Sequence, residues 1–179
     1  MSLDLVDLDA ETRTHMLAEL ERDIRGETLY ISRYLSETGQ DRYPLLLREA
    51  IESGDDGTLA FALASEPGLF VSKYEKRKPK GGFTLASVPV TAPQTLAEGE
   101  YNRFYLRAIC LRAIDSEYDD IEVYRARESQ NPRTASLAMV GARLNAASVL
   151  ADLRANPGVD TALGLPPGPN SGLSGRLLG

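Results

Sequence analysis

The side chains of this chain that could carry chemistry are carboxylates, tyrosines and arginines, because His15 is the only histidine and Cys110 the only cysteine in 179 residues. General acid–base catalysis, covalent catalysis and zinc binding mostly use at least two groups from the histidine, cysteine and carboxylate set. Carboxylates alone support reactions such as glycoside hydrolysis, which need two acids at a defined separation. No spacing in this sequence specifies such a pair, so we predict no catalytic residue, no metal ligand and no cofactor.

One stretch, from Glu98 to Arg107, gathers polar groups at the start of an expected helix. Arg103 and Arg107 lie four residues apart, so a helix places them on one face that can grip a phosphate or a carboxylate. A carboxylate-dependent enzyme would use this stretch and is our second alternative for the function. We favour a structural interpretation, because early acids suit the helix dipole and arginines pair with nearby acids. The candidate polar face consists of Glu100, Arg103 and Arg107, with Glu98 and Tyr101 beside it.

A second stretch is strongly basic and is followed by Gly81-Gly82. Mobile positive side chains on a hairpin tip can contact phosphates or an acidic protein surface. The simplest interpretation is an exposed turn that lysine keeps soluble, since the whole chain carries a net charge of −6 and nucleic-acid-binding domains are usually basic. The candidate contacts with nucleic acid or with a protein partner are Lys73, Lys76, Arg77, Lys78 and Lys80.

Helices are expected throughout the acidic first part of the chain, residues 1–68, which hold 15 acids and 6 bases. Asp9 can cap a first helix over residues 10–25, where apolar residues recur at helical spacing. Residues 28–35 fit either a strand or two turns of helix, and we expect a helix. Two more helices are expected, from Tyr43-Pro44 to Ser53-Gly54 and from Asp55 or Asp56 to Pro67-Gly68.

The mixed second part, residues 69–158, is expected to contain strands as well as helices. A hairpin is predicted at about 69–88, with residues 75–82 as its basic loop. The apolar residues from 92 or 99 to 115 cover a wide arc, which predicts a central helix. The other expected elements are a strand at about 121–126, a helix over 142–155 and an extended, Pro/Gly-rich C-terminal arm over 159–179.

These elements predict an α+β fold, predominantly helical, in which the hairpin and the 121–126 strand form one small antiparallel sheet. Residues 1–158 are expected to form a single domain from which the arm extends. Apolar runs fall short of the roughly 18 to 20 residues that cross a bilayer, and residues 1–9 are acidic, unlike a signal peptide. We therefore expect no membrane contact, and a protein in the cytoplasm or in a particle assembled there.

The charge is polarised along the chain: residues 1–68 carry −9, from 15 acids and 6 bases, and residues 69–179 carry +3, from 11 acids and 14 bases. Such asymmetry favours self-association or docking on partners of opposite charge. We predict a non-enzymatic structural subunit that forms homo- or hetero-oligomers within a multimeric complex, such as a virion component or part of an injection-type particle. The first alternative is a small regulatory or nucleic-acid-associated binding module that uses the basic hairpin over residues 73–80.

Overall fold

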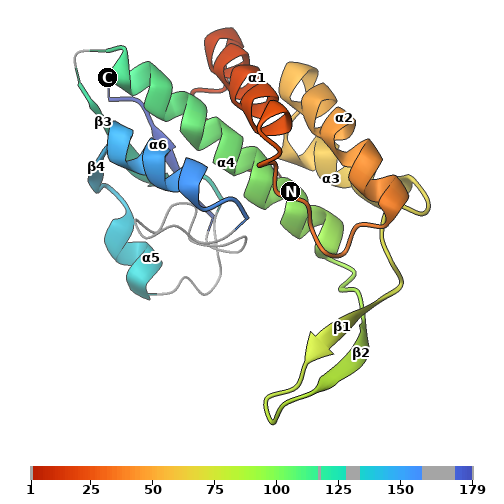
Figure 1. Ribbon diagram of the computed structural model, residues 1–179. Helices are drawn as coiled ribbons and strands as arrows, with labels where there is room; N and C mark the ends of the chain where they lie inside the picture. The colour runs from red at the N-terminus through yellow and green to blue at the C-terminus, as the bar shows by residue number, and fades with distance from the viewer. Residues whose placement is uncertain (1, 117, 128–133, 159–171, 179) are drawn as a thin grey trace.

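Helix α4 (Ala92–Ile114) lies at the centre of the molecule (Figure 1). The computed structural model describes residues 2–116, 118–127, 134–158 and 172–178. From Tyr101 to Cys110 every side chain of α4 is buried, which explains why its apolar residues cover so wide an arc. The helix contacts α1 and α3 on one side, and α6 with the strands β3 and β5 on the other. The prediction of a central helix is therefore confirmed.

Three helices form the layer on one side of α4: α1 (Ala10–Arg25), α2 (Glu37–Ser53) and α3 (Asp56–Ser65). The start of α1 is fixed by Asp9, whose Oδ1 accepts a hydrogen bond of 2.9 Å from the backbone N–H of Thr12. Asp55 caps α3 in the same way, because its Oδ1 accepts from the backbone N–H of Thr58 at 2.7 Å. Both of these helices begin where the capping residues predicted.

The predicted helix over residues 28–35 is wrong. The segment is irregular, with a turn in which the Leu35 N–H donates to Ser32 O at 3.0 Å, and its end pairs with a distant part of the chain. Leu35 forms an isolated antiparallel bridge with Phe70, and the backbone N–H of Ser36 donates to Leu69 O at 2.8 Å. Ser36 then caps α2 by accepting a hydrogen bond from the Gly39 N–H. Helix α2 consequently begins before the predicted start, and Pro44 lies inside it.

Strands form two separate antiparallel sheets in the described residues. One is the hairpin of β1 (Lys73–Arg77) and β2 (Phe83–Ser87). The other has β3 (Asp120–Arg125) in the middle, between β4 (Arg143–Asn145) and β5 (Leu173–Arg176). The α+β, predominantly helical fold is confirmed, whereas the expectation that the hairpin and β3 share one sheet is wrong. The hairpin projects away from the body, so it does not reach β3 (Figure 1).

The end of the expected C-terminal arm is a strand built into the core. Leu173 and Ser174 of β5 are buried against α4. The Asn102 side-chain amide donates to Leu173 O at 2.9 Å, and Ser174 Oγ donates to Asn102 Oδ1 at 2.6 Å. Residues 159–171 and 179 of the predicted arm lie outside the described residues.

The described residues between β3 and β5 include two helices, α5 (Thr134–Met139) and α6 (Ala146–Ala155). Helix α6 begins later than predicted because residues 143–145 pair with β3 as β4, and Asn145 then caps the helix. Across the ranges that the structure describes, no helix is both long enough and apolar enough to cross a membrane.

Candidate functional site

The hairpin of β1 and β2 projects from the rest of the molecule (Figure 1). Its strands pair from Lys73 opposite Ser87 to Arg77 opposite Phe83. The turn is closed by a hydrogen bond of 2.9 Å from the Lys78 N–H to Gly82 O. Gly82 has a φ of 78°, a left-handed conformation that glycine adopts without strain.

All five predicted basic contacts lie on this hairpin and are exposed. Lys73, Lys76 and Arg77 belong to β1, while Lys78 and Lys80 lie in the turn, so the strand extends further into the predicted basic loop than expected. Within the described ranges, none of the five forms an ion pair with an acidic side chain. The fold therefore gathers them on one projecting element and leaves their charges uncompensated by ion pairs.

One face of the hairpin also carries apolar side chains that the sequence interpretation did not single out. Phe83 is 65% exposed and Leu85 is 68% exposed. Residues opposite each other in an antiparallel pair share a face, so the register sets Phe83 beside Arg77 and Leu85 beside Glu75. The alternation Phe83-x-Leu85 was the sequence signal for this face. The Phe83 ring and the Arg77 guanidinium therefore belong to the same face of the hairpin.

The opposite face anchors the hairpin to the body. The ring of Tyr74 meets that of Tyr34 edge to face, with centroids 4.8 Å apart. The Arg33 guanidinium lies 4.8 Å from the centroid of the Tyr74 ring and donates a hydrogen bond to the Tyr34 hydroxyl. That hydrogen bond lowers the pKa of Tyr34 below its ordinary value. These contacts hold the root of the hairpin, while its other face stays open.

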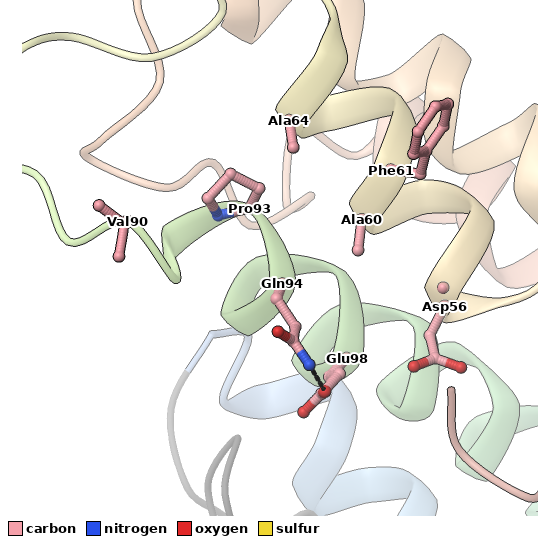
Figure 2. A pocket seen from close by; sticks show the side chains of 9 residues that line it. Asp56, Ala60, Phe61, Ala64, Val90, Pro93, Gln94 and Glu98 are labelled. Carbon is pink, nitrogen blue, oxygen red and sulfur yellow. Dashed lines mark hydrogen bonds between the residues drawn. The ribbon is translucent and has the colours of Figure 1, made fainter. Parts of the chain in front are cut away.

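Two neighbouring cavities lie at the base of the hairpin, and we call them together the α3 groove. They share Ala64, Val90 and Pro93. The larger cavity, of about 440 Å³, lies between the end of α3 and the segments that lead into and out of the hairpin. The smaller, of about 270 Å³, lies between α3 and the start of α4 (Figure 2). Phe61, which is 74% exposed, also lines the smaller cavity, and Val90 is 97% exposed.

The smaller cavity has an acidic end, formed by Asp56 and Glu98 (Figure 2). Asp56 is only 1% exposed. Its Oδ1 accepts a hydrogen bond of 2.9 Å from the Leu3 N–H, but its Oδ2 has no hydrogen-bond partner in the part of the chain that the structure describes. Burial raises the pKa of Asp56 to about 6. The buried carboxyl group of Asp56 therefore has too few hydrogen bonds to offset the loss of contact with water.

Glu98 is better compensated than Asp56. Its Oε1 accepts hydrogen bonds from Gln94 Nε2 at 2.7 Å and from Arg127 Nη1 at 2.8 Å. The nearby Glu98 charge also contributes to the raised pKa of Asp56. The α3 groove is consequently lined mostly by apolar residues towards the hairpin, where the one charged lining residue, Glu66, pairs with Arg42, and it is acidic at its other end. The sequence interpretation missed this role of Asp56, because the residue looked like one of two possible helix caps.

The predicted polar face of α4 lies inside the molecule. Arg107 is 1% exposed, and its guanidinium donates to Glu19 Oε2 at 2.6 Å and to both oxygens of Asp23 at 2.5 and 2.9 Å. Arg154 of α6 also donates to Glu19. Arg107 thus joins α4 to α1, and Arg154 joins α6 to the same Glu19 of α1, so these arginines pair with acids as the structural interpretation predicts.

The other residues of that stretch also face partners in the core. Arg103 Nε lies 3.4 Å from Glu100 Oε1, and its Nη1 donates to Asn156 O. Burial raises the pKa of Glu100 to about 7. The hydroxyl of Tyr101 donates to Gly54 O at 3.2 Å. Of the five residues considered for a carboxylate-dependent enzyme, Glu98 is the one that lines the α3 groove.

Within the described residues, no cluster of three or more His, Cys, Asp or Glu side chains is placed to hold a metal ion. Comparison with protein-family models, with curated proteins and with solved structures finds no match for this chain. A function must therefore be inferred from the hairpin and the α3 groove themselves.

Proposed function

We propose that this chain is a non-enzymatic assembly subunit, which docks onto neighbouring protein subunits of a multimeric complex through its projecting hairpin. The observation that carries this proposal is the exposure of Phe83 and Leu85 on a sheet of only two strands. An isolated two-stranded hairpin is at best marginally stable in water. A partner that covers the open face would stabilise the hairpin and the complex together.

The energetic gain available at this face is substantial. Full burial of a phenylalanine or leucine side chain contributes about 1.5–3 kcal/mol. The hairpin strands also have edges whose backbone N–H and C=O groups can pair with a strand from a partner. Apolar contacts and strand addition can therefore act at the same surface.

Within this proposal, the basic residues favour a viral or injection-type particle as the setting. Subunits of such a particle surround nucleic acid, and Lys78 and Lys80 at the tip of the hairpin would meet phosphates or an acidic protein surface there. The docking face and the basic tip would then serve the same assembly.

The test is the mass of the purified chain in solution, measured by sedimentation over a wide range of concentrations. The wild type is expected to form a complex larger than a monomer, and the double variant Phe83→Ser/Leu85→Ser is expected to remain monomeric. Leu137→Ser/Val140→Ser is the matched control, because it removes two exposed apolar side chains from the α5 region instead. A wild type that stays monomeric at every concentration, or an assembly that the hairpin variant leaves intact, would overturn the proposal.

A nucleic-acid-associated binding module is the second candidate, favoured by five exposed basic side chains without ion pairs in the described residues. Its signature is an affinity for a fluorescent oligonucleotide that falls steeply with salt. Replacing Lys76, Lys78 and Lys80 by glutamine should then reduce both the affinity and the salt dependence. An oligonucleotide that shows no change of anisotropy at low salt would remove this candidate.

A further inference from the structure

The geometry points to the α3 groove as the docking site for the hairpin of a second copy of this chain. In this contact, Phe83 of the incoming hairpin enters the apolar cavity and Arg77 meets the acidic end. The inference rests on the proposed function, because it names the neighbour and the surface to which the hairpin docks.

The charges of the two surfaces are complementary. Residues 49–72, which include α3, contain five acids and no basic residue, and two of these acids, Glu49 and Glu66, pair with Arg42 of α2. Residues 73–82, which form β1 and the turn, contain five basic residues and one acid, a net charge of +4. Opposite charges of this kind steer two surfaces together and fix their register. A hairpin is therefore attracted to the α3 region of another molecule.

The hairpin face carries an apolar and a positively charged side chain next to each other, and the groove has an apolar and an acidic part next to each other. Phe83 and Arg77 are direct cross-strand partners and share one face of the hairpin. The α3 groove presents a mostly apolar cavity of about 440 Å³ next to a cavity that ends at Asp56 and Glu98. A ring and a guanidinium from one face can thus occupy adjacent parts of one groove.

Asp56 is the residue that most needs such a partner. A buried carboxylate oxygen without a hydrogen bond is costly, and Asp56 Oδ2 is in this position within the described residues. A guanidinium supplies a positive charge and paired N–H donors that fit a carboxylate. Docking of Arg77 would satisfy Asp56 once its side chain turns towards the groove, since the oxygen is covered in the isolated molecule.

Each molecule carries both the hairpin and the α3 groove. The segments that lead into and out of the hairpin, including Val71 and Val88, line the larger cavity, so the hairpin leaves the body beside its own groove. Two molecules can therefore exchange hairpins about a two-fold axis, with both grooves filled.

A double-mutant cycle on the full chain tests the polar part of the contact. Sedimentation equilibrium would give the dimer dissociation constant for Arg77→Gln, Asp56→Asn and the double variant. Each single change is expected to weaken association at least tenfold, and the double variant to be little weaker than either single one, because both remove the same pair. Arg143→Gln and Glu52→Gln are matched controls, since they remove the same charges from exposed positions outside both the hairpin and the groove.

A second variant tests the apolar part and does not depend on how Asp56→Asn folds. Ala64 lines both cavities and is exposed, so Ala64→Arg fills the groove with little effect on the core. It is expected to abolish dimerisation, whereas Ser65→Arg, which adds the same charge at the next position of α3 outside the groove lining, is not.

The outcomes separate this inference from the proposed function. If the hairpin variant Phe83→Ser/Leu85→Ser abolishes association but Ala64→Arg leaves it intact, the hairpin docks elsewhere and only the present inference fails. If Arg77→Gln and Asp56→Asn weaken association independently, the assigned pairing is wrong. A wild type that is monomeric at all concentrations overturns both proposals.

Discussion

Arg107 is the side chain on which the core should depend most, because it is buried and holds Glu19 and Asp23 of α1. Its removal leaves two buried carboxylates with less compensation, although Arg154 still reaches Glu19. We predict that Arg107→Ala lowers the free energy of unfolding by about 3 kcal/mol, measured by urea denaturation. Arg22→Ala removes an exposed arginine near the same Asp23 and should cost less than about 0.5 kcal/mol. Equal effects of Arg107→Ala and Arg22→Ala on the free energy of unfolding would contradict the role that we assign to Arg107 in the core.

Glu100 should make stability fall as pH rises. Its pKa in the folded state is about 7, above the ordinary value of 4.5, so the folded state binds more protons than the unfolded state between these values. Stability due to this group is complete below about pH 4.5 and is lost as pH rises towards 7, by about 3 kcal/mol in all. We predict that Glu100→Gln is more stable than the wild type at pH 8, as measured by thermal and urea unfolding.

The control for this prediction is Glu52→Gln, at an exposed position. It reports the effect of removing one exposed carboxyl group. Glu100→Gln should flatten the pH dependence of stability without abolishing it, because Asp56 titrates in part of the same range. A wild type whose stability rises between pH 4.5 and 7 would contradict the direction that we assign to these groups.

Sequence reasoning at this scale identified the kind of interaction but not the partners. That the arginines of α4 pair with acids follows from their chemistry, whereas the choice of Glu19 and Asp23 depends on how α1 packs across α4. Asp56 carried no sequence signal beyond that of a helix cap, because its burial depends on the approach of Leu3.

At the scale of elements, local signals were sufficient where a capping side chain decided the start of a helix. Asp9 and Asp55 fixed α1 and α3 in this way. The failure at residues 28–35 has a tertiary cause, since the bridge between Leu35 and Phe70 outweighs a weak local preference. The strands β4 and β5 are short and pair with the distant β3, so neither has a periodic pattern of its own.

Strand β5 yields a prediction about packing. A Cβ at Gly175 would lie 2.8 Å from Leu106 Cδ2 and 2.9 Å from Ile121 Cδ1, both on fully buried side chains. Gly175→Val should therefore lower the free energy of unfolding by about 1–3 kcal/mol in a urea titration. Gly99→Ala is the contrasting control, because nothing lies near that position of α4, and it should raise stability by about 0.5–1 kcal/mol. A neutral Gly175→Val would show that β5 packs loosely.

At the scale of the whole molecule, the C-terminal residues belong to the core and so constrain how assembly can be tested. Cutting the chain at residue 159 would remove β5 together with the Pro/Gly-rich segment. If such a truncated chain formed no complex, the cause could be a loss of folding as much as a loss of docking. Point variants of the hairpin avoid this difficulty, because the side chains of Phe83 and Leu85 are exposed.

The acidic and the basic parts of the sequence correspond to two different regions of the structure. The acidic part contains α3 and one wall of the groove, and the hairpin carries the strongest cluster of basic residues. The sequence predicted the basic hairpin, but the groove arises from the packing of α3 against α4 and had no sequence signature. The proposed self-association would bring these two regions of different copies together.

The most direct test of the docking account is hydrogen exchange of the β1 and β2 backbone amides at increasing protein concentration. In the dilute monomer, we predict rapid exchange in the hairpin and slow exchange in α4, because an exposed two-stranded sheet opens readily while the central helix is buried. As the complex forms, the hairpin amides should become protected in step with the measured mass. Hairpin amides that exchange at the same rate in monomer and complex would show that the hairpin is not the docking element.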